Sequence, residues 1–479
     1  MIAPAPVPAY EPRPGTIPTL SVPDLSKVRR AHLVGIGGAG MSGIARLFLA
    51  REVAVSGSDL KDSRGLDALR ELGAEIAVGH DPVNLGAPDV VVISSAIPVG
   101  NPELRAAQER GLPVYMRAQA LAALLGGFRT IAVAGTHGKT TTTSMGAVVL
   151  ESAGLDPTYV IGGELNESGS NARAGRGEVA ITEADESDGS FLLLSPAVGI
   201  VTNVEEDHLD FYAGREEIEA AFRAYCARCE VVVACGDDPG VRRVTAGLRQ
   251  RLLTYGFGAD NDAVVTSFQD EAGGALGSVS FDGDEVPFHV SVPGRHNLLN
   301  AAAVILAARE VGVKPALAAA GLEAFAGVRR RFEHRGSARG AEFVDDYAHH
   351  PSEIAATIDA ARSRHTGRLV AVFQPHRYTR TAAMWQELGE SLAGADAVIV
   401  TDVYGAGEVP IPGVTGKLLV EALLERRPRV RAAYLPRRSE VAPYVARIVR
   451  PGDLVLTLGA GDITMVADEI LQRLAEEAA

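Results

Sequence analysis

Cysteine is scarce in this sequence, with 3 thiols among 479 residues, at positions 226, 229 and 235. So few thiols exclude a disulfide framework and are typical of a protein from a reducing compartment. The spacing Cys226-x-x-Cys229 matches half of a zinc site, but no second pair follows it. We therefore interpret these cysteines as buried or incidental thiols on a helix that precedes a strand.

Long apolar runs and an excess of positive charge are also missing. No stretch approaches the roughly 20 apolar residues that a membrane-spanning helix needs. The net charge of -14 argues against non-specific binding of nucleic acid or anionic membrane. The first thirty residues are rich in proline and contain no apolar segment typical of a signal peptide, so we expect a flexible leader over residues 1–29. These features predict a cytoplasmic protein without membrane insertion.

Short apolar runs alternate with helical patterns through most of the chain, which is the signature of βαβ units and parallel sheets. At roughly 150 residues per domain, the length suggests about three domains. We expect an α/β fold with domains over residues 30–127, 128–331 and 332–479. The turn Asp282-Gly283-Asp284 and its surroundings predict a small antiparallel edge on the middle sheet. The expected strands cover residues 32–36, 53–56, 74–78, 90–94, 113–116, 129–134, 179–182, 198–202, 231–235, 342–345, 369–374, 397–401 and 454–457, and the expected helices include 41–50, 141–153 and 297–310.

The segment Gly135-Thr136-His137-Gly138-Lys139-Thr140 follows an apolar strand and opens a helix. Backbone N–H groups at such a junction bind phosphate, and the helix dipole favours negative charge. Lys139 would add a charge for the β- and γ-phosphates of ATP, and the Thr140 hydroxyl would reach Mg²⁺. The usual G-x-x-x-x-G-K-[ST] pattern needs glycine at 133, where this chain has valine, so we predict a shorter variant of the loop.

Two acidic segments follow apolar strands of the same domain. The first is Glu183-Ala-Asp185-Glu186-Ser-Asp188, and the second runs from Asn203 to Asp210 and contains His208. Parallel strands bring their carboxyl ends to the edge that carries the phosphate loop. Because hard oxygen ligands suit Mg²⁺, we predict a metal site at that edge.

A second glycine loop, Gly35-Ile-Gly37-Gly38-Ala39-Gly40, follows the first expected strand, and Asp59 lies near the end of the next. The pattern fits the dinucleotide fingerprint, which leaves an NAD(P)-dependent oxidoreductase open. A nucleotide-diphosphate sugar satisfies the same geometry, because the loop itself requires only a pyrophosphate on the helix N-terminus. An oxidoreductase would leave Lys139 and both acidic segments unexplained, and a nucleotide-gated binding protein without ligase chemistry remains a further alternative.

Together these segments resemble the Mur ligases of peptidoglycan synthesis. The matching stretches are GIGGAGMSG from Gly35, GTHGKTTTT from Gly135, EADESDGSF from Glu183, TNVEEDHLD from Thr202, GRHNLLN from Gly294, RRFE from Arg330, DDYAHHP from Asp345 and FQPHRYTR from Phe373. The resemblance covers nearly everything after Arg30. It implies a Rossmann-like UDP-binding domain, a P-loop ATPase domain and a C-terminal Rossmann-like α/β domain that binds an amino acid.

The resemblance also implies a reaction. A C–N bond-forming ligase would join L-alanine to the lactyl carboxylate of UDP-N-acetylmuramate through an acyl phosphate, with ATP and Mg²⁺ and with small-molecule partners only, as a monomer or homodimer. By the same resemblance, this would be the first amino-acid addition in cell wall precursor synthesis. The alternative within the family is the ligase that attaches a murein tripeptide to the same UDP-sugar, and the full FQPHRYTR segment favours the single-alanine enzyme.

The site residues implied by the resemblance fall into five groups. ATP would contact Gly135, Thr136, His137, Gly138, Lys139, Thr140, Thr141, His296, Asn297, Asn300, Arg331 and Asp346. The metal would be held by Thr140, Glu183 and His208. The UDP-sugar would contact Gly37, Gly38, Ala39, Gly40, Met41, Ser42, Asp59, Ser94 and Ser95. The amino acid would contact Tyr347, His349, Arg377 and Arg380. The catalytic residues would be Lys139, His208, Arg331, His349, Arg377 and Arg380, although the base that deprotonates the amine is not determined by the sequence.

Overall fold

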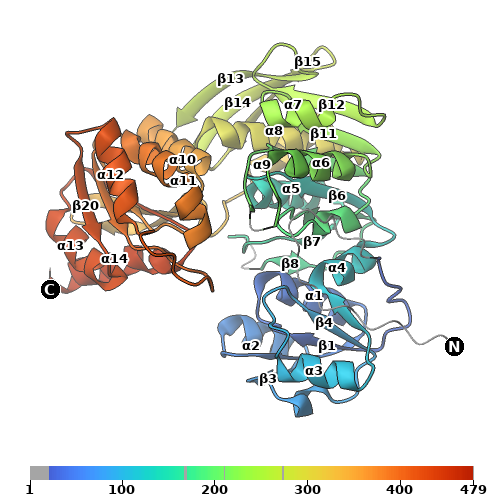
Figure 1. Cartoon of the computed structure of the whole chain (residues 1–479). Coiled ribbons are helices and arrows are strands. Elements are labelled where there is room, and N and C mark those ends of the chain that lie inside the picture. The colour runs from blue at the N-terminus through green and yellow to red at the C-terminus, as the bar shows by residue number, and fades with distance from the viewer. Residues whose placement is uncertain (1–20, 167–169, 210, 272–273, 478–479) are drawn as a thin grey trace. The chain divides into compact units, whose positions relative to one another are not determined.

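The computed structural model describes residues 21–166, 170–209, 211–271 and 274–477, so most of the leader expected over residues 1–29 lies outside the described residues. The chain forms two compact units. The first comprises Met1–Val265, Val279–Val286 and Leu299–Phe325, and the second comprises Thr266–Ser278, Pro287–Leu298 and Ala326–Ala479. Within the described residues the strands form three sheets, of 5, 10 and 6 strands. Figure 1 shows the helices and strands in order along the chain. None of the described helices is both long and apolar enough to cross a bilayer.

The N-terminal sheet is entirely parallel, with the strand order β3-β2-β1-β4-β5. Its elements are β1 (Arg30–Val34), α1 (Ala39–Ala50), β2 (Ala54–Asp59), α2 (Arg64–Glu71), β3 (Glu75–Val78), η1 (Pro82–Leu85), β4 (Val90–Ile93), α3 (Pro102–Glu109), β5 (Val114–Met116) and α4 (Arg117–Leu125). Strand β1 ends two residues before the expected end, because Gly35 has a φ of 75° and the N–H groups of Gly35 and Ile36 both bond to the Ser58 carbonyl. Five parallel strands therefore end at one edge, where the first glycine loop lies.

The middle sheet has the order β15-β14-β13-β12-β11-β10-β6-β9-β7-β8. Its core elements are β6 (Arg129–Ala134), α5 (Lys139–Ser152), β7 (Thr158–Val160), β8 (Ala172–Arg173), β9 (Val179–Glu183), η2 (Ser190–Leu193), β10 (Val198–Val201), α6 (Arg215–Cys226), β11 (Val231–Cys235), α7 (Pro239–Thr245), α8 (Arg295–Glu310) and α9 (Pro315–Leu322). Strand β6 pairs in parallel with β9 on one side and with β10 on the other. The strand that carries the phosphate loop therefore lies between the two strands that end in acidic segments.

The far end of this sheet differs in part from the expectation of short antiparallel strands. Strand β12 (Arg251–Gly256) pairs in parallel with β11 and with β13 (Ala263–Glu271), and β13 and β14 (Gly274–Phe281) are longer than the mean strand. The predicted antiparallel turn does form between β14 and β15 (Asp284–Val290). It consists of Asp282 and Gly283, whose φ angles of 52° and 85° are those of a two-residue hairpin.

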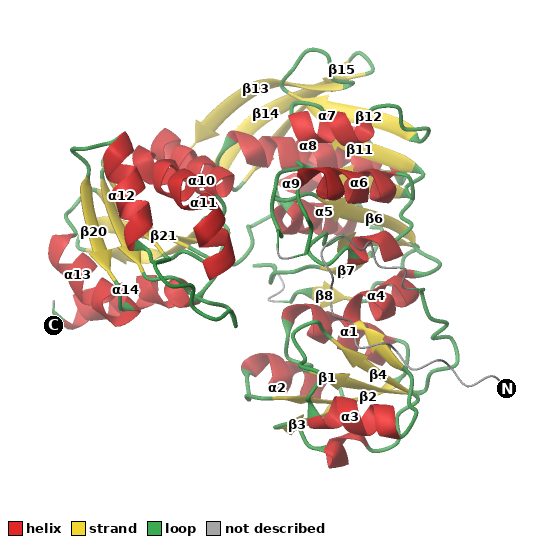
Figure 2. Cartoon of the chain, in the orientation of Figure 1, coloured by secondary structure: helices red, strands yellow, loops and turns green. Residues whose placement is uncertain are grey.

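The C-terminal sheet has the order β16-β17-β21-β18-β19-β20, with only β16 antiparallel to its neighbour. Its elements are β16 (Glu333–Ala338), β17 (Ala341–Asp346), α10 (Pro351–Arg364), β18 (Arg368–Phe373), α11 (Tyr378–Ser391), η3 (Leu392–Gly394), β19 (Ala397–Thr401), α12 (Lys417–Arg426), β20 (Arg431–Leu435), η4 (Arg438–Glu440), α13 (Val441–Ile448), β21 (Asp453–Leu458), η5 (Asp462–Met465) and α14 (Val466–Glu476). Helices α10, α11 and α12 pack on one face, and α13 and α14 pack on the other (Figure 2). This is the doubly wound arrangement expected for the domain.

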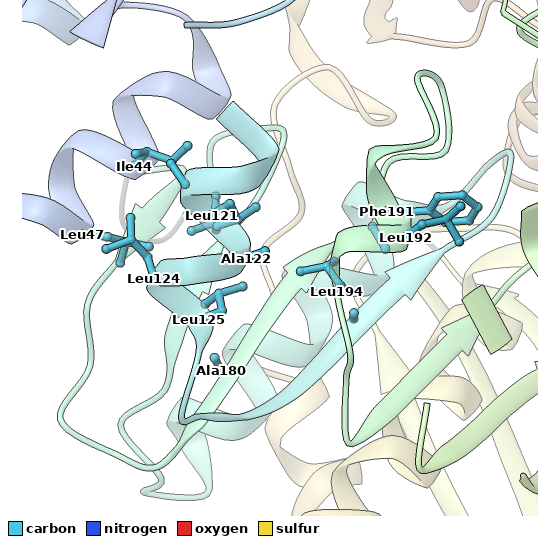
Figure 3. Packing of buried hydrophobic residues seen from close by; sticks show 14 of the residues in the cluster. Ile44, Leu47, Leu121, Ala122, Leu124, Leu125, Ala180, Phe191, Leu192 and Leu194 are labelled. Carbon is cyan, nitrogen blue, oxygen red and sulfur yellow. The ribbon is translucent and has the colours of Figure 1, made fainter. Parts of the chain in front are cut away.

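Helix α4 joins the N-terminal and middle sheets within the first unit. Its apolar residues Leu121, Leu124 and Leu125 belong to one buried cluster that also contains Ile44 of α1 and Leu194 after η2 (Figure 3). Helix α1 itself packs against the edge of the middle sheet, because a Cβ on Gly43 would lie 3.1 Å from Val160 and 3.2 Å from Ala172. The glycine loop that precedes α1 is therefore held by close packing next to the middle sheet.

Candidate functional site

The phosphate loop connects β6 to α5 and depends on two glycines. Gly135 has a φ of 140°, and a Cβ there would lie 2.0 Å from the Thr202 Oγ1. Gly138, the residue before α5, has a φ of 82°, and a Cβ there would lie 3.1 Å from the Asn300 Oδ1. Both positions combine a left-handed backbone with a close neighbour, so only glycine fits without strain. The shorter loop predicted from the sequence therefore has its glycine at 135 for a steric reason.

The segment after β10 holds the loop in place. The His137 N–H donates to the Asn203 Oδ1 over 2.7 Å, and the His137 carbonyl accepts from the Thr202 hydroxyl over 2.6 Å. On the other side, the Glu205 N–H donates to the Thr136 hydroxyl over 2.9 Å. These bonds fix the conformation of the loop, which would reduce the ordering cost of binding a phosphate there.

Lys139, the first residue of α5, lies over the loop. Its ammonium donates to the Gly135 carbonyl over 2.6 Å and lies 2.9 Å from the Glu186 carboxylate. Burial alone would lower the pKa of Lys139, but the negative charges of Glu186 and Asp185 raise it above its ordinary value. The lysine is therefore charged at neutral pH.

Thr140 and Glu183 meet at the same edge. A hydrogen bond joins the Thr140 side chain to the Glu183 carboxylate, which also accepts the Gly162 N–H over 2.7 Å. Burial raises the pKa of Glu183. Burial would also raise the pKa of the neighbouring Asp185, but the positive charges of Lys139 and Arg117 lower it below its ordinary value. A hydroxyl and two carboxylates gathered at the loop form a hard oxygen donor set, which fits Mg²⁺.

His208 lies beside these groups and has a left-handed φ of 53°. Its Nε2 is 3.6 Å from the Glu186 Oε1 and 3.7 Å from the Asp207 Oδ2. Burial would lower the pKa of His208, but the hydrogen bond to Glu186 and the charge of Asp207 raise it. His208 therefore lies beside Glu186 of the acidic segment that follows β9.

The first glycine loop lies at the carboxyl edge of the N-terminal sheet. The Asp59 Oδ2 accepts the Gly37 N–H over 2.9 Å, and α1 begins at Ala39. Met41 and Ser42 lie in the first turn of α1, and Ser94 and Ser95 follow β4 at the same edge. All the residues predicted to bind the UDP-sugar therefore come from a strand end, loops and a helix start at this one edge.

In the second unit, the predicted ATP contacts Arg331 and Asp346 lie near each other. Asp346 ends β17, and its two oxygens accept the N–H groups of Phe332 over 2.7 Å and Ala348 over 2.8 Å. Burial raises the pKa of Asp346 to about 6, although the charge of Arg331 opposes the increase. Arg331 lies 5.0 Å from the ring centre of Tyr347 and 3.7 Å from Glu353.

The predicted amino-acid site is a cluster of aromatic rings and arginines. His349 lies 5.2 Å from the Tyr347 ring and 5.7 Å from the His376 ring, which stacks on Tyr404. Burial and the nearby charges of Arg380 and Arg377 lower the pKa of His376 to about 4. Arg377 precedes α11 with a φ of 69°, at the junction of strand and helix that the sequence predicted. The structure therefore brings all four predicted amino-acid contacts to the same end of this sheet.

Helix α8 carries the remaining three predicted ATP contacts. Burial lowers the pKa of His296 to about 4, so this ring is neutral at pH 7. The Asn297 side chain donates to the Pro293 carbonyl over 2.7 Å, at the start of the helix. Asn300 lies beside Gly138 of the phosphate loop, as described above.

The three cysteines are free and buried, as the sequence predicted. Cys226 ends α6, and Cys229 follows it before β11. Burial raises the pKa of Cys226 to about 12 and that of Cys235 to about 11, so these thiols are protonated at neutral pH.

Sequence reasoning gave no individual role to three residues that the structure places in the site. Asn203 supports the phosphate loop, Glu186 pairs with Lys139, and Arg117 covers Gly40 of the glycine loop. Asn203 and Glu186 lie within stretches that the sequence already singled out. Arg117 had no such signal, because it lies 77 positions from Gly40 in the chain.

Comparison with known proteins agrees with this geometry. Three family models match in succession: the "Mur ligase family, catalytic domain" over residues 30–129, the "Mur ligase middle domain" over 133–308 and the "Mur ligase, glutamate ligase domain" over 330–461. A UDP-N-acetylmuramate–L-alanine ligase of Saccharopolyspora erythraea is 50% identical over 463 residues, which is 94% of either chain. One of Mycolicibacterium smegmatis is 48% identical over 465 residues, covering 94% of this chain and 95% of its own.

Two solved structures are also similar. The crystal structure of UDP-N-acetylmuramate–alanine ligase from Thermotoga maritima has a TM-score of 0.80 at 29% identity, covering 94% of this chain and 99% of its own. A murein peptide ligase from Psychrobacter arcticus has a TM-score of 0.69 at 26% identity, covering 93% and 98%. Because the sheets, both glycine loops and the matches over nearly the whole described chain agree, this chain belongs to the Mur ligase family.

Proposed function

We propose that this chain catalyses the ATP-dependent ligation of L-alanine to the lactyl carboxylate of UDP-N-acetylmuramate, through an acyl phosphate. The observation that carries the proposal is the 50% identity to a UDP-N-acetylmuramate–L-alanine ligase over 94% of both chains. The products would be ADP, phosphate and UDP-N-acetylmuramoyl-L-alanine, which makes this the first amino-acid addition to the peptidoglycan precursor. We also propose that the protein acts in the cytoplasm and that its partners are small-molecule substrates.

The first chemical step converts a poor electrophile into a good one. The lactyl carboxylate attacks the γ-phosphorus of ATP, the bond to the β–γ bridging oxygen breaks, and ADP leaves. Charge develops on the oxygens of the transferred phosphoryl group. Lys139 lies 2.6 Å from the Gly135 carbonyl at the phosphate loop, where its charge would stabilise these oxygens.

A divalent cation would be held by the Thr140 hydroxyl and the Glu183 carboxylate, with His208 in support through Glu186. These groups fit Mg²⁺ because Thr140 and Glu183 are already hydrogen-bonded to each other at the loop. When bound, the ion would neutralise phosphate charge and orient the triphosphate.

The second step is attack of the alanine amine on the acyl carbon, with loss of phosphate. We propose that Tyr347, His349, Arg377 and Arg380 bind the amino acid, because the structure brings them to one end of the C-terminal sheet. The paired guanidinium groups would hold the carboxylate of alanine. His349 contacts the Tyr347 carbonyl over 3.0 Å and Glu353 over 3.3 Å, which orients its ring to accept a proton from the amine. The predicted roles of Arg331 and Asp346 toward ATP remain part of this proposal.

Coupled measurement of ADP formation tests the function directly. Activity should require UDP-N-acetylmuramate and L-alanine together, and UDP-N-acetylglucosamine, which lacks the lactyl carboxylate, should not replace the first. A murein tripeptide serves as the competing amine, since the murein peptide ligase is the nearest alternative in chemistry. Activity with the tripeptide and none with L-alanine would overturn the assignment.

A matched pair of lysine variants tests the phosphate loop. Lys139→Ala should lower kcat by about 10²–10³-fold, by analogy with the loss of one preorganised donor. Lys314→Ala removes an exposed lysine at the start of α9, in the same unit, and should leave kcat unchanged. Near-normal turnover of Lys139→Ala would exclude this loop from the chemistry.

A further inference from the structure

Arg117 connects the two loops of the first unit. It is the first residue of α4 and directly follows β5, so it lies at the edge where β1, β2 and β4 also end. A Cβ added to Gly40 would lie 2.5 Å from the Arg117 Nη1 and 3.2 Å from its Cζ, which shows that the guanidinium covers Gly40. Its Nη2 is 3.8 Å from the Asp185 Oδ2, in the acidic segment after β9.

The packing of α4 gives this arginine a defined position. The apolar side of α4 lies in the buried cluster shared with α1 and with the segment around η2 (Figure 3). Leu124 and Ala120 of that side are 1% and 0% exposed. Because α4 is packed on both sides, the position of its first residue is fixed, and the guanidinium is preorganised over the glycine loop.

The positive charge of Arg117 suits a diphosphate bound at the glycine loop. The loop and first turn of α1, Gly35–Ser42, contain no basic residue, and the Asp59 carboxylate accepts the Gly37 N–H at the same loop. The backbone N–H groups and the helix dipole supply only a partial positive charge for a diphosphate that carries two negative charges. A guanidinium with several N–H donors in a fixed fork is suited to phosphate oxygens.

We propose that Arg117 is a positioning residue for the UDP-sugar, whose diphosphate it binds over Gly40 while its second nitrogen faces Asp185. The inference rests on the proposed function and adds a residue to it. Binding of the diphosphate would place the sugar relative to the acidic segment, because one side chain contacts both. It also explains glycine at position 40, since any side chain there displaces the guanidinium.

The first test measures binding without catalysis, by isothermal titration with UDP-N-acetylmuramate, UDP-N-acetylglucosamine and UDP. Arg117→Gln should bind all three about 10- to 100-fold more weakly, the effect of losing a charged hydrogen bond, and Arg117→Lys should recover part of the loss. Arg105→Gln, an exposed arginine of α3 in the same sheet region, should bind as the unaltered protein does. Equal binding by Arg117→Gln, or weakening confined to UDP-N-acetylmuramate, would overturn the assignment to the diphosphate.

The second test is a double-mutant cycle with Gly40→Ala. If the new methyl group acts by displacing the guanidinium, Gly40→Ala should weaken UDP binding in the unaltered protein and have little further effect in Arg117→Ala. An equal loss in both backgrounds would show that Gly40 matters for another reason and would overturn the proposal.

Steady-state kinetics separates a positioning role from a general structural one. The KM for the UDP-sugar should rise with the loss of binding while the KM for ATP stays within about twofold, because the phosphate loop is held by other contacts. A parallel rise in both KM values would indicate a folding defect and would contradict the positioning role. If the unaltered protein bound no UDP-sugar at all, the proposed function would fail before this inference could be tested.

Discussion

Replacing Glu103 by glutamine should destabilise the N-terminal sheet, because this buried carboxylate joins several of its elements. The side chain is 0% exposed. It accepts hydrogen bonds from His32 on β1 over 3.0 Å, from Ser58 on β2 over 2.6 Å and from Asn84 on η1 over 2.8 Å, and also from the Asp81 N–H over 3.0 Å. A glutamine amide would point a donor at groups that are already donors.

The size of the effect follows from the pKa of Glu103. Burial alone would raise this pKa, but the hydrogen bonds from His32, Ser58, Asn84 and Asp81 lower it from 4.5 to about 2. At about 1.4 kcal/mol for each pH unit, that difference corresponds to roughly 3 kcal/mol of folding free energy. Since the pKa is lower in the folded state, the stabilisation is fully present above pH 4.5 and is lost as the pH falls from 4.5 toward 2.

Two measurements check this reasoning. Hydrogen exchange at pH 7 should show that peptides of β1 and β2 exchange about 100-fold faster in Glu103→Gln. This factor is the same free energy expressed as a change in the equilibrium constant for opening. Urea unfolding followed by circular dichroism should show a gap in the free energy of unfolding between Glu103→Gln and unaltered protein. This gap should narrow below pH 4.5. Glu109→Gln, at the exposed end of the same helix α3, is the matched control and should show no gap. A gap that is absent at pH 7, or that stays constant as the pH falls, would refute the argument.

Two further predictions concern the middle sheet. Gly135→Ala should lower kcat/KM by roughly 5- to 150-fold, because a Cβ would lie 2.0 Å from the Thr202 Oγ1 at a φ of 140°, at a cost of about 1–3 kcal/mol; normal kinetics with ATP would contradict the loop geometry. The thiols of the native protein should not react with a disulfide reagent at pH 8 but should all react in urea, because burial raises their pKa values. Fast reaction of any thiol in the native state would show that it is exposed.

The buried network around Glu103 also bears on the glycine loop. The Ser58 hydroxyl donates to Glu103, and the Ser58 carbonyl accepts the N–H groups of Gly35 and Ile36 at the start of the loop. Asp59, the next residue, accepts the Gly37 N–H. The carboxylate beneath the sheet therefore supports the loop that we propose to bind the diphosphate, through two consecutive residues of β2.

Local features of this protein were readable from the sequence alone. The apolar run Arg129–Ala134 is a strand with the predicted bounds, and so are Val231–Cys235 and Ala397–Thr401. The glycine loops lie between a strand and a helix as predicted, because the residues that permit a left-handed turn and the residues that begin a helix are adjacent in the chain. Strands β8, β16 and β20 were not predicted. Strand β8 has only two residues, and β16 has the sequence EHRGSA, which lacks an apolar pattern.

Only the tertiary structure decided which distant residues meet. The sequence predicts that parallel strands end at a common edge, but not that β6 lies between β9 and β10, because strand order depends on pairings that spacing along the chain does not encode. The same is true of Arg117 over Gly40 and of Glu103 beneath His32 and Ser58, which are 71 and 45 positions from it. The glycine loops consist of consecutive residues. The charged residues around them are distant in the chain and are brought close by the packing of helices on sheets.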